Sequence, residues 1–154
     1  MIRLNANDVF QIAEKMERDG AEFYRAAARG ADDNQRSVLL ALAEMEFNHE
    51  RIFAAMRSEF ARDNPYPTEC PPDSPCALYL KAAVDGIIFS QQPATKLTGD
   101  ESVDEIFETA ITLEKDSIVF YQSMKSVAPP GQARDQIDEI IEQEIGHILE
   151  LTRE

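Results

Sequence analysis

The chain has 154 residues, of which 44% are hydrophobic and 29% are charged, and its formal net charge is −14 at pH 7. This length supports one hydrophobic core, so we expect a single domain of globular character. The negative charge argues against a nucleic-acid partner, because phosphate backbones attract basic surfaces. No apolar run reaches membrane-spanning length and residues 1–8 lack the apolar centre of a secretory signal, so we expect no membrane partner and a cytoplasmic location.

The first two predicted helices form a pair with a short connection. The first spans about residues 7–29, and Gly30 offers a C-terminal stop. The second begins near Asp32 or Asp33, because either side chain can act as an N-cap, and it continues to residue 60. A connection this short predicts that the two helices run antiparallel.

The middle of the chain has a different composition. Residues 63–75 contain five prolines, so this segment is predicted to be a loop. Cys76 to about Ser90 is predicted as a short extra helix, followed by a second loop over residues 91–100. Cys70 and Cys76 cannot form a four-cysteine metal site, and we expect reduced thiols in a reducing cytosol, although a disulfide within the loop would also fit.

The last two predicted helices form a second pair. Ser102 and Glu105 have the spacing of a capping box, which places a helix start there, and this helix continues to about Ser126. Pro129-Pro130-Gly131 then interrupts the chain, and the fourth helix begins near Ala133.

These elements predict an all-α protein. A helix pair over residues 7–60, a crossover insert over 61–100 and a helix pair over 101–153 together indicate an antiparallel four-helix bundle with one long crossover connection that carries a short extra helix.

The two helix pairs resemble each other in sequence. When Glu17 is aligned with Glu114, Tyr24 also matches Tyr121. The second helices of the pairs match as well, since each contains a Glu followed three residues later by a His. An internal repeat of two helical hairpins is the simplest interpretation.

Each helix interrupts its apolar face with acidic or imidazole side chains near its middle. The six residues concerned are Glu17, Glu46, His49, Glu114, Glu144 and His147. Both histidines of the chain follow a Glu by three positions, a step that keeps both donors on one helix face about 4.5 Å apart along the axis. Four buried carboxylates would be costly without compensating charge, and two divalent cations would supply it. The six residues are therefore predicted to bind a pair of metal ions.

Two other pairs of residues lie close to these positions. Tyr24 follows Glu17 by seven residues, and Tyr121 follows Glu114 by seven. The tyrosines either fill the core or hydrogen-bond a ligand carboxylate of a neighbouring helix, and we favour the second role. Gly20 and Ser117 are matched small residues, which either permit close helix packing or leave an open coordination region for an oxidant.

These motifs resemble the ferritin-like di-iron carboxylate superfamily, and most closely its rubrerythrin-like branch. They are Glu17…Phe23-Tyr24, Glu46-Phe47-Asn48-His49, Glu114…Phe120-Tyr121 and Glu144-Ile145-Gly146-His147. The resemblance covers both helix pairs but not the insert, and it implies a ferritin-like fold. It further implies that Glu46 and Glu144 bridge two ions, that Glu17 and Glu114 are terminal ligands, and that His49 and His147 each bind one ion.

The chain departs from the rubrerythrin pattern in two respects. Rubrerythrins typically have a further Glu three residues after the third-helix ligand, where this chain has Ser117. They also usually append a rubredoxin domain, and this chain lacks the four cysteines that such a domain needs. The six-residue set is closer to that of bacterioferritin, but only seven residues follow His147, which leaves no room for the extra helix of ferritin-type cages.

Three functions are compatible with these observations. The first is a di-iron oxidoreductase that reduces peroxide or dioxygen with electrons from a separate donor protein. The second is a ferroxidase or iron-handling protein with Fe(II) as its substrate, and the third is a non-enzymatic metal-binding module. Iron is the expected metal, although manganese, a mixed iron–manganese pair or zinc suits the same ligands. We expect a homodimer.

Overall fold

The computed structural model describes residues 5–63, 73–89 and 97–153, and within these ranges the chain forms five α-helices. The helices are α1 (Ala6–Ala28), α2 (Asp33–Asp63), α3 (Pro75–Phe89), α4 (Val103–Met124) and α5 (Gln132–Arg153). In the described part of the chain, no helix is both long and apolar enough to cross a membrane.

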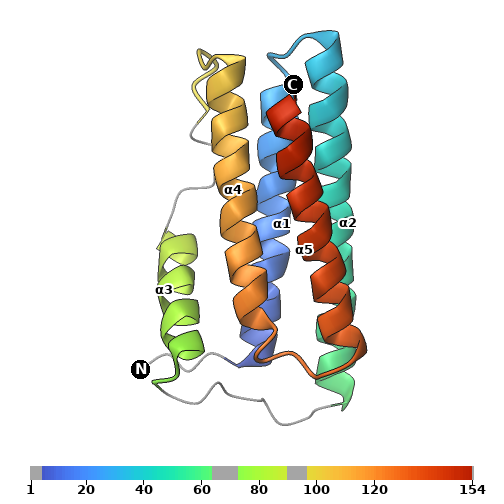
Figure 1. The fold of residues 1–154 in the computed structure, drawn as a ribbon, viewed down its shortest axis with the longest axis vertical. Helices are drawn as coiled ribbons and strands as arrows, with labels where there is room; N and C mark the ends of the chain where they lie inside the picture. Colours follow the sequence, from blue (N-terminus) through green and yellow to red (C-terminus); the bar gives the residue numbers. More distant parts are fainter. Residues whose placement is uncertain (1–4, 64–72, 90–96, 154) are drawn as a thin grey trace.

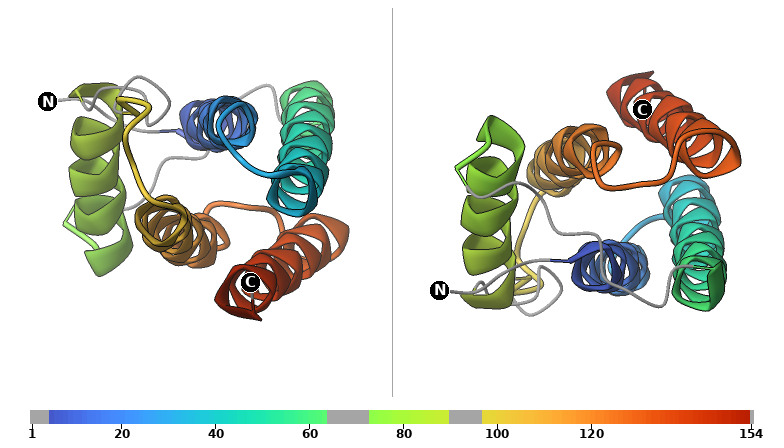
Figure 2. Two further views of the ribbon diagram at one scale, coloured as in Figure 1. Left: turned by 90° about the horizontal axis from the view of Figure 1, so that it is seen from above. Right: turned by 90° about the horizontal axis from the view of Figure 1, so that it is seen from below.

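The four long helices α1, α2, α4 and α5 lie side by side along the long axis of the molecule (Figure 1). Viewed from either end, α1 lies between α2 and α4, and α5 lies between the same two helices on the other side (Figure 2). Neighbouring helices run antiparallel (Figure 1). The predicted all-α, antiparallel four-helix bundle is therefore confirmed.

Helix α3 packs against the side of this bundle, where it contacts α4 and α1 (Figures 1 and 2). Its Leu80 is fully buried in the core, and Tyr79 packs against the same cluster. The long connection also returns the chain to the opposite end of the bundle: α2 ends at one end and α4 starts at the other, so these two helices run in the same direction (Figure 1). The crossover predicted from the sequence therefore exists and carries the extra helix.

Polar caps define where three of the helices begin. Ser102 and Glu105 form the predicted capping box of α4, with reciprocal bonds of 3.2 and 2.7 Å. Asp32 accepts a hydrogen bond of 2.9 Å from the backbone of Gln35, which identifies Asp32 rather than Asp33 as the residue that caps α2. Helix α1 begins slightly earlier than predicted, because Asn5 forms a capping box with Asp8.

The other helix ends differ from prediction by at most three residues. Helix α2 extends to Asp63 and α4 stops at Met124, whereas α3 and α5 each begin one residue earlier than expected. Parts of the two predicted loops, residues 64–72 and 90–96, lie outside the described residues. Cys70 and the side chain of Cys76 also lie outside them, so the state of the two thiols stays a prediction.

The apolar core is divided into two clusters, one toward each end of the bundle. The first cluster contains Phe10, Phe53, Tyr121 and Ile137 together with their neighbours. The second contains Tyr24, Leu42, Phe107 and Leu151 together with theirs. On every long helix, the residues between the two clusters include buried charged or imidazole side chains. A polar layer therefore crosses the bundle at mid-height.

Candidate metal centre

The polar layer contains all six residues that the sequence predicts as metal ligands. Each is at most 4% exposed, and two of them are fully buried. Glu17 comes from α1, Glu46 and His49 from α2, Glu114 from α4, and Glu144 and His147 from α5. The structure therefore brings the six side chains together from all four long helices.

These side chains form two overlapping clusters. The first consists of Glu17, Glu46, His49 and Glu144, and the second of Glu46, Glu114, Glu144 and His147. Within each cluster, one potential ligand atom from every residue lies within 4.8 Å of the others. Glu46 and Glu144 belong to both clusters, whereas the other residues belong to one. The arrangement thus has two shared carboxylates, and each cluster adds one carboxylate and one imidazole of its own.

Both imidazoles direct Nδ1 toward the carboxylates. His49 Nδ1 lies 3.0 Å from an oxygen of Glu144 and 3.5 Å from an oxygen of Glu17. His147 Nδ1 lies 2.8 Å from Glu144, 3.1 Å from Glu46 and 3.4 Å from Glu114. Three acceptors around one nitrogen exceed what one N–H group can satisfy, so the atoms converge on shared points rather than forming simple pairs.

Many of the buried polar atoms of these six residues have no hydrogen-bond partner in the described part of the protein. They are Oε2 of Glu17, Oε1 of Glu46, both carboxylate oxygens of Glu144, Nδ1 of His49, and both ring nitrogens of His147. Buried polar atoms without partners are rare, because each costs its full desolvation energy. Lone pairs that face one another at these distances are what a cation would bridge, so the donor set fits a pair of metal ions.

Burial and mutual repulsion change the protonation of the carboxylates. Burial, reinforced by the charge of Glu144, raises the pKa of Glu17 to about 7. Burial also raises the pKa of Glu46, and the charges of Glu17 and Glu144 add to this effect. Both groups therefore retain protons at a pH where an exposed carboxyl is ionised.

The histidines also have raised pKa values, but the cause is their contact with carboxylates rather than burial. Burial alone would lower the pKa of His49, but contacts with Glu144 and Glu17 outweigh it and raise the pKa to about 11. Burial likewise opposes the charge on His147, whereas contacts with Glu114, Glu144 and Glu46 raise its pKa to about 12. The imidazolium groups thus supply positive charge to the cluster, and bound metal ions would have to displace their Nδ1 protons.

Two other buried carboxylates in this chain have their negative charge balanced by a basic side chain. Glu14 accepts a hydrogen bond of 3.2 Å from Nη2 of Arg57, and Asp19 pairs with Lys15 one helical turn away. Each of these acids is therefore matched by a basic side chain. Among the described residues, no Lys or Arg forms an ion pair with the four glutamates of the centre, which pair with histidines alone.

Glu17 and Glu114, the carboxylates that belong to one cluster each and are here called terminal, contact the two tyrosines crosswise. Tyr24 of α1 donates a hydrogen bond to Oε1 of Glu114 on α4, and Tyr121 of α4 donates one to Oε1 of Glu17 on α1. Burial raises the pKa of both phenols, and the neighbouring carboxylate charges raise it further. Both tyrosines therefore remain hydrogen-bond donors to the carboxylates.

The two small residues near the terminal glutamates have different surroundings. A Cβ atom added to Gly20 would lie 2.9 Å from Oε2 of Glu46, so the absence of a side chain makes room for this shared carboxylate. Ser117 turns its hydroxyl to the backbone oxygen of Leu113. The proposal that both leave an open coordination region stays a prediction.

Gln143 is a contact that the sequence analysis did not identify. Its Oε1 lies 2.7 Å from Nε2 of His49, on the side of the ring that faces away from the carboxylates. The rings of His49 and His147 also stack, with centroids 5.8 Å apart and an interplanar angle of 20°. The sequence gives little reason to single out Gln143, because an exposed Gln next to a Glu is common on helices. The one sequence feature that distinguishes it is that the matching position of the other repeat holds Met45.

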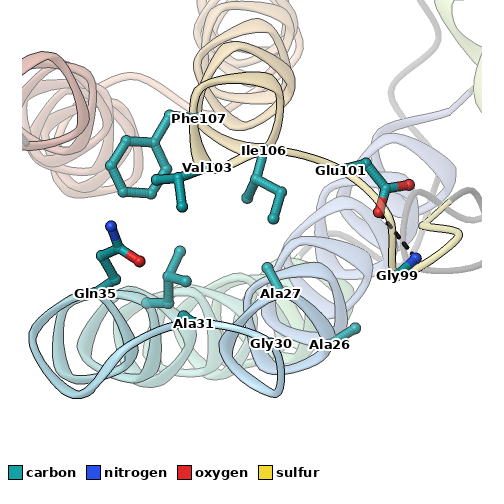
Figure 3. Close-up of a pocket in the computed structure, with 11 residues that line it drawn as sticks. Ala26, Ala27, Gly30, Ala31, Gln35, Gly99, Glu101, Val103, Ile106 and Phe107 are labelled. Atoms are coloured by element: carbon teal, nitrogen blue, oxygen red, sulfur yellow. Dashed lines mark hydrogen bonds between the residues drawn. The ribbon is translucent and has the colours of Figure 1, made fainter.

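A small pocket exists at one end of the bundle, away from the centre. Ala27, Gln35, Val103, Ile106 and Phe107 are among its lining residues, and Figure 3 shows them facing one another between α1, α2 and α4. None of the six predicted ligands lines it. The candidate metal centre is thus enclosed by the bundle rather than open to this pocket.

The fold of the chain is similar to that of a protein of known structure. No protein-family model matches the chain, and no curated protein matches it. Its structure is similar to the crystal structure of a Thermotoga maritima protein assigned as a ferritin-like diiron-carboxylate protein, with a TM-score of 0.73 and 23% sequence identity. The match covers 99% of this chain and 95% of the other. The chain therefore has a ferritin-like fold, and its buried carboxylate–histidine clusters fit a di-metal site.

Proposed function

We propose that this chain is a rubrerythrin-like di-iron oxidoreductase that reduces peroxide or dioxygen with electrons from a separate donor protein. The observation that carries the proposal is the pair of buried clusters with Glu46 and Glu144 in common. Two shared carboxylates would hold two ions close together, which favours reactions that need electrons from both. The similar Thermotoga maritima protein, assigned as a diiron-carboxylate protein, supports the same metal.

The clusters suggest how the ligands divide between the ions. Glu17 and His49 would bind one ion, Glu114 and His147 would bind the other, and Glu46 and Glu144 would bridge them. The mixed oxygen and nitrogen donors suit iron and manganese. Iron is the proposed metal because a pair of iron ions can cycle between two oxidation states and so supply two electrons.

Side chains around the six ligands would keep the carboxylates in position and exclude water from the centre. Tyr24 and Tyr121 anchor the terminal carboxylates by hydrogen bonds, which limits their motion. The two apolar clusters above and below the polar layer exclude bulk water. Reduction of hydrogen peroxide would break its O–O bond, consume two electrons and two protons, and yield two water molecules. The donor protein would then return two electrons to the metal pair.

Stopped-flow oxidation of the di-ferrous protein tests the proposal. Anaerobic protein loaded with two equivalents of Fe(II) is mixed with peroxide or with dioxygen, and the rise of ferric absorbance is followed. We expect rapid oxidation by at least one of the two, and a much slower reaction in Glu46→Ala, which lacks a shared carboxylate. If neither peroxide nor dioxygen oxidises the di-ferrous protein faster than it oxidises free Fe(II), the redox proposal is wrong. Continued turnover of excess Fe(II) without a donor would instead identify Fe(II) as the substrate.

A further inference from the structure

The outer nitrogens of the two histidines have different surroundings. Nε2 of His49 lies 2.7 Å from Oε1 of Gln143, whereas Nε2 of His147 is buried and has no hydrogen-bond partner among the described residues. Both inner nitrogens, Nδ1, face carboxylates: two lie near that of His49 and three near that of His147. Behind the rings, only His49 has a hydrogen-bond partner among the described residues.

The two repeats also differ in sequence at the position that supplies this partner. Gln143 immediately precedes the shared Glu144 on α5, and Met45 occupies the matching place before the shared Glu46 on α2. A Gln side chain offers an amide oxygen that accepts a hydrogen bond well, whereas a Met thioether accepts one weakly. The repeat therefore supplies an amide acceptor at this position on α5 but not on α2.

An acceptor behind an imidazole matters for metal binding. When Nδ1 of a neutral ring gives its lone pair to a metal, the proton must lie on Nε2, which then becomes a donor. The Gln143 oxygen would accept that proton from His49, hold the ring in the correct tautomer and fix its orientation. His147 would have to bind metal with its outer N–H buried and unmatched.

We propose that Gln143 is a positioning residue that makes the two metal subsites unequal. The subsite of Glu17 and His49 fills first and more tightly, and the subsite of Glu114 and His147 fills second. This inference rests on the proposed di-metal site. Because loss of such an outer partner typically costs about 10- to 100-fold in metal affinity, the two dissociation constants should differ by a factor of this order.

The histidine content of the chain makes a direct test practical. His49 and His147 are its only histidines, so ring ¹⁵N NMR gives one set of signals for each subsite. Zn²⁺ is a suitable probe because it is diamagnetic and has no redox chemistry. During a Zn²⁺ titration at neutral pH, we expect the His49 signals to shift over the first equivalent and the His147 signals over the second.

Substitutions at Gln143 and Met45 distinguish a positioning role of the amide oxygen from a role in packing alone. Gln143→Met should weaken binding at His49 about 10- to 100-fold and abolish the filling order, whereas Gln143→Glu, which keeps an acceptor, should preserve it. Met45→Gln should tighten the second step. Circular dichroism of the metal-free variants confirms that each is folded.

Two results would overturn the inference, and they are distinguishable. Parallel shifts of both rings in the unmodified protein, or an unchanged filling order in Gln143→Met, would show that Gln143 does not set the order while leaving the di-metal site intact. If neither ring responds to Zn²⁺ or to Fe(II), the di-metal site itself is absent and the inference fails with it.

Discussion

Tyr121 on α4 donates a hydrogen bond to Glu17 on α1, so a side chain from one repeat holds a carboxylate of the other. Tyr24 makes the reciprocal bond to Glu114. The two bonds cross the same helix interface in opposite directions. Glu17 is therefore bonded to α4, the helix of Glu114, and Glu114 is bonded to α1, the helix of Glu17. A shift of either helix would move carboxylates of both clusters.

Replacing either tyrosine with phenylalanine should weaken both the fold and metal binding. The buried carboxylate would lose a hydrogen bond, which typically costs about 1–3 kcal/mol of stability. Metal affinity at the affected subsite should fall by about 10-fold or more. Denaturant unfolding and anaerobic Co²⁺ titration measure the two effects. Tyr79→Phe, on the half-buried α3 face, is the matched control, and an equal loss in that variant would argue against a specific role.

The shared and terminal carboxylates should differ in how many ions they control. Glu46→Ala removes a residue that belongs to both clusters, so bound metal should fall from two ions toward none. Glu17→Ala removes a residue of one cluster only, so about one ion should remain. Metal analysis after gel filtration gives the stoichiometry. Equal losses in both variants would contradict the assignment of Glu46 as a bridge.

Gly20 should tolerate a methyl group less well than another helical glycine of the same chain. A Cβ at Gly20 would lie 2.9 Å from Oε2 of Glu46, whereas one at Gly146 would have no heavy atom within 4 Å. Gly146→Ala should therefore stabilise the protein by about 0.5–1 kcal/mol, the usual gain in a helix. Gly20→Ala should lose that gain and shift Glu46, which weakens metal binding. Comparable stabilisation by both substitutions would show that Glu46 moves freely.

The stability of the metal-free protein should decrease as pH rises. The folded-state pKa of Glu17, about 7, exceeds its unfolded value of 4.5, so its contribution is complete below pH 4.5 and is lost as pH rises through 7. For His49 and His147 the values are about 11 and about 12 against 6.5, so their contribution is complete below pH 6.5 and is lost at high pH. Urea unfolding at pH 5, 7 and 9 measures the trend.

A substitution at Glu17 isolates its share of this dependence. Glu17→Gln cannot ionise, so the decrease between pH 5 and 7 should become smaller in that variant. Metal uptake should show the opposite pH dependence, because ions must displace ligand protons and bind more tightly as pH rises. Proton release measured in weakly buffered solution checks this point. A metal-free protein that is more stable at pH 9 than at pH 5 would contradict the assignment.

Much of the fold was predictable because its signals are local. The capping box of Ser102 and Glu105, the prolines of the insert and the apolar period of each helix act through neighbouring residues, so the helices could be placed within three residues of their ends. The cap at Asn5 was not predicted: its capping box with Asp8 starts α1 at Ala6, one residue before the expected start.

The candidate centre was predictable in its members but not in its geometry. Glu46, His49, Glu144 and His147 interrupt apolar faces at a repeated spacing, and that pattern is visible in one dimension. The bridging role of Glu46 and Glu144 was expected from the family resemblance rather than from a local pattern. Which helix each tyrosine reaches depends on how the four helices are arranged around the axis. Such contacts join residues about 90 to 100 positions apart, for example Tyr24 with Glu114, and local patterns do not encode them.

The sequence by itself therefore determined the helices, the repeat and the set of six candidate ligands, since propensity, periodicity and spacing act over a few residues. Only the tertiary structure decided that Tyr24 and Tyr121 contact the glutamates of each other's helix, that Gly20 makes room for Glu46, and that Gln143 lies behind His49 alone. The physical reason is that hydrogen bonds and steric contacts act at about 3 Å, and helix packing sets which side chains come that close.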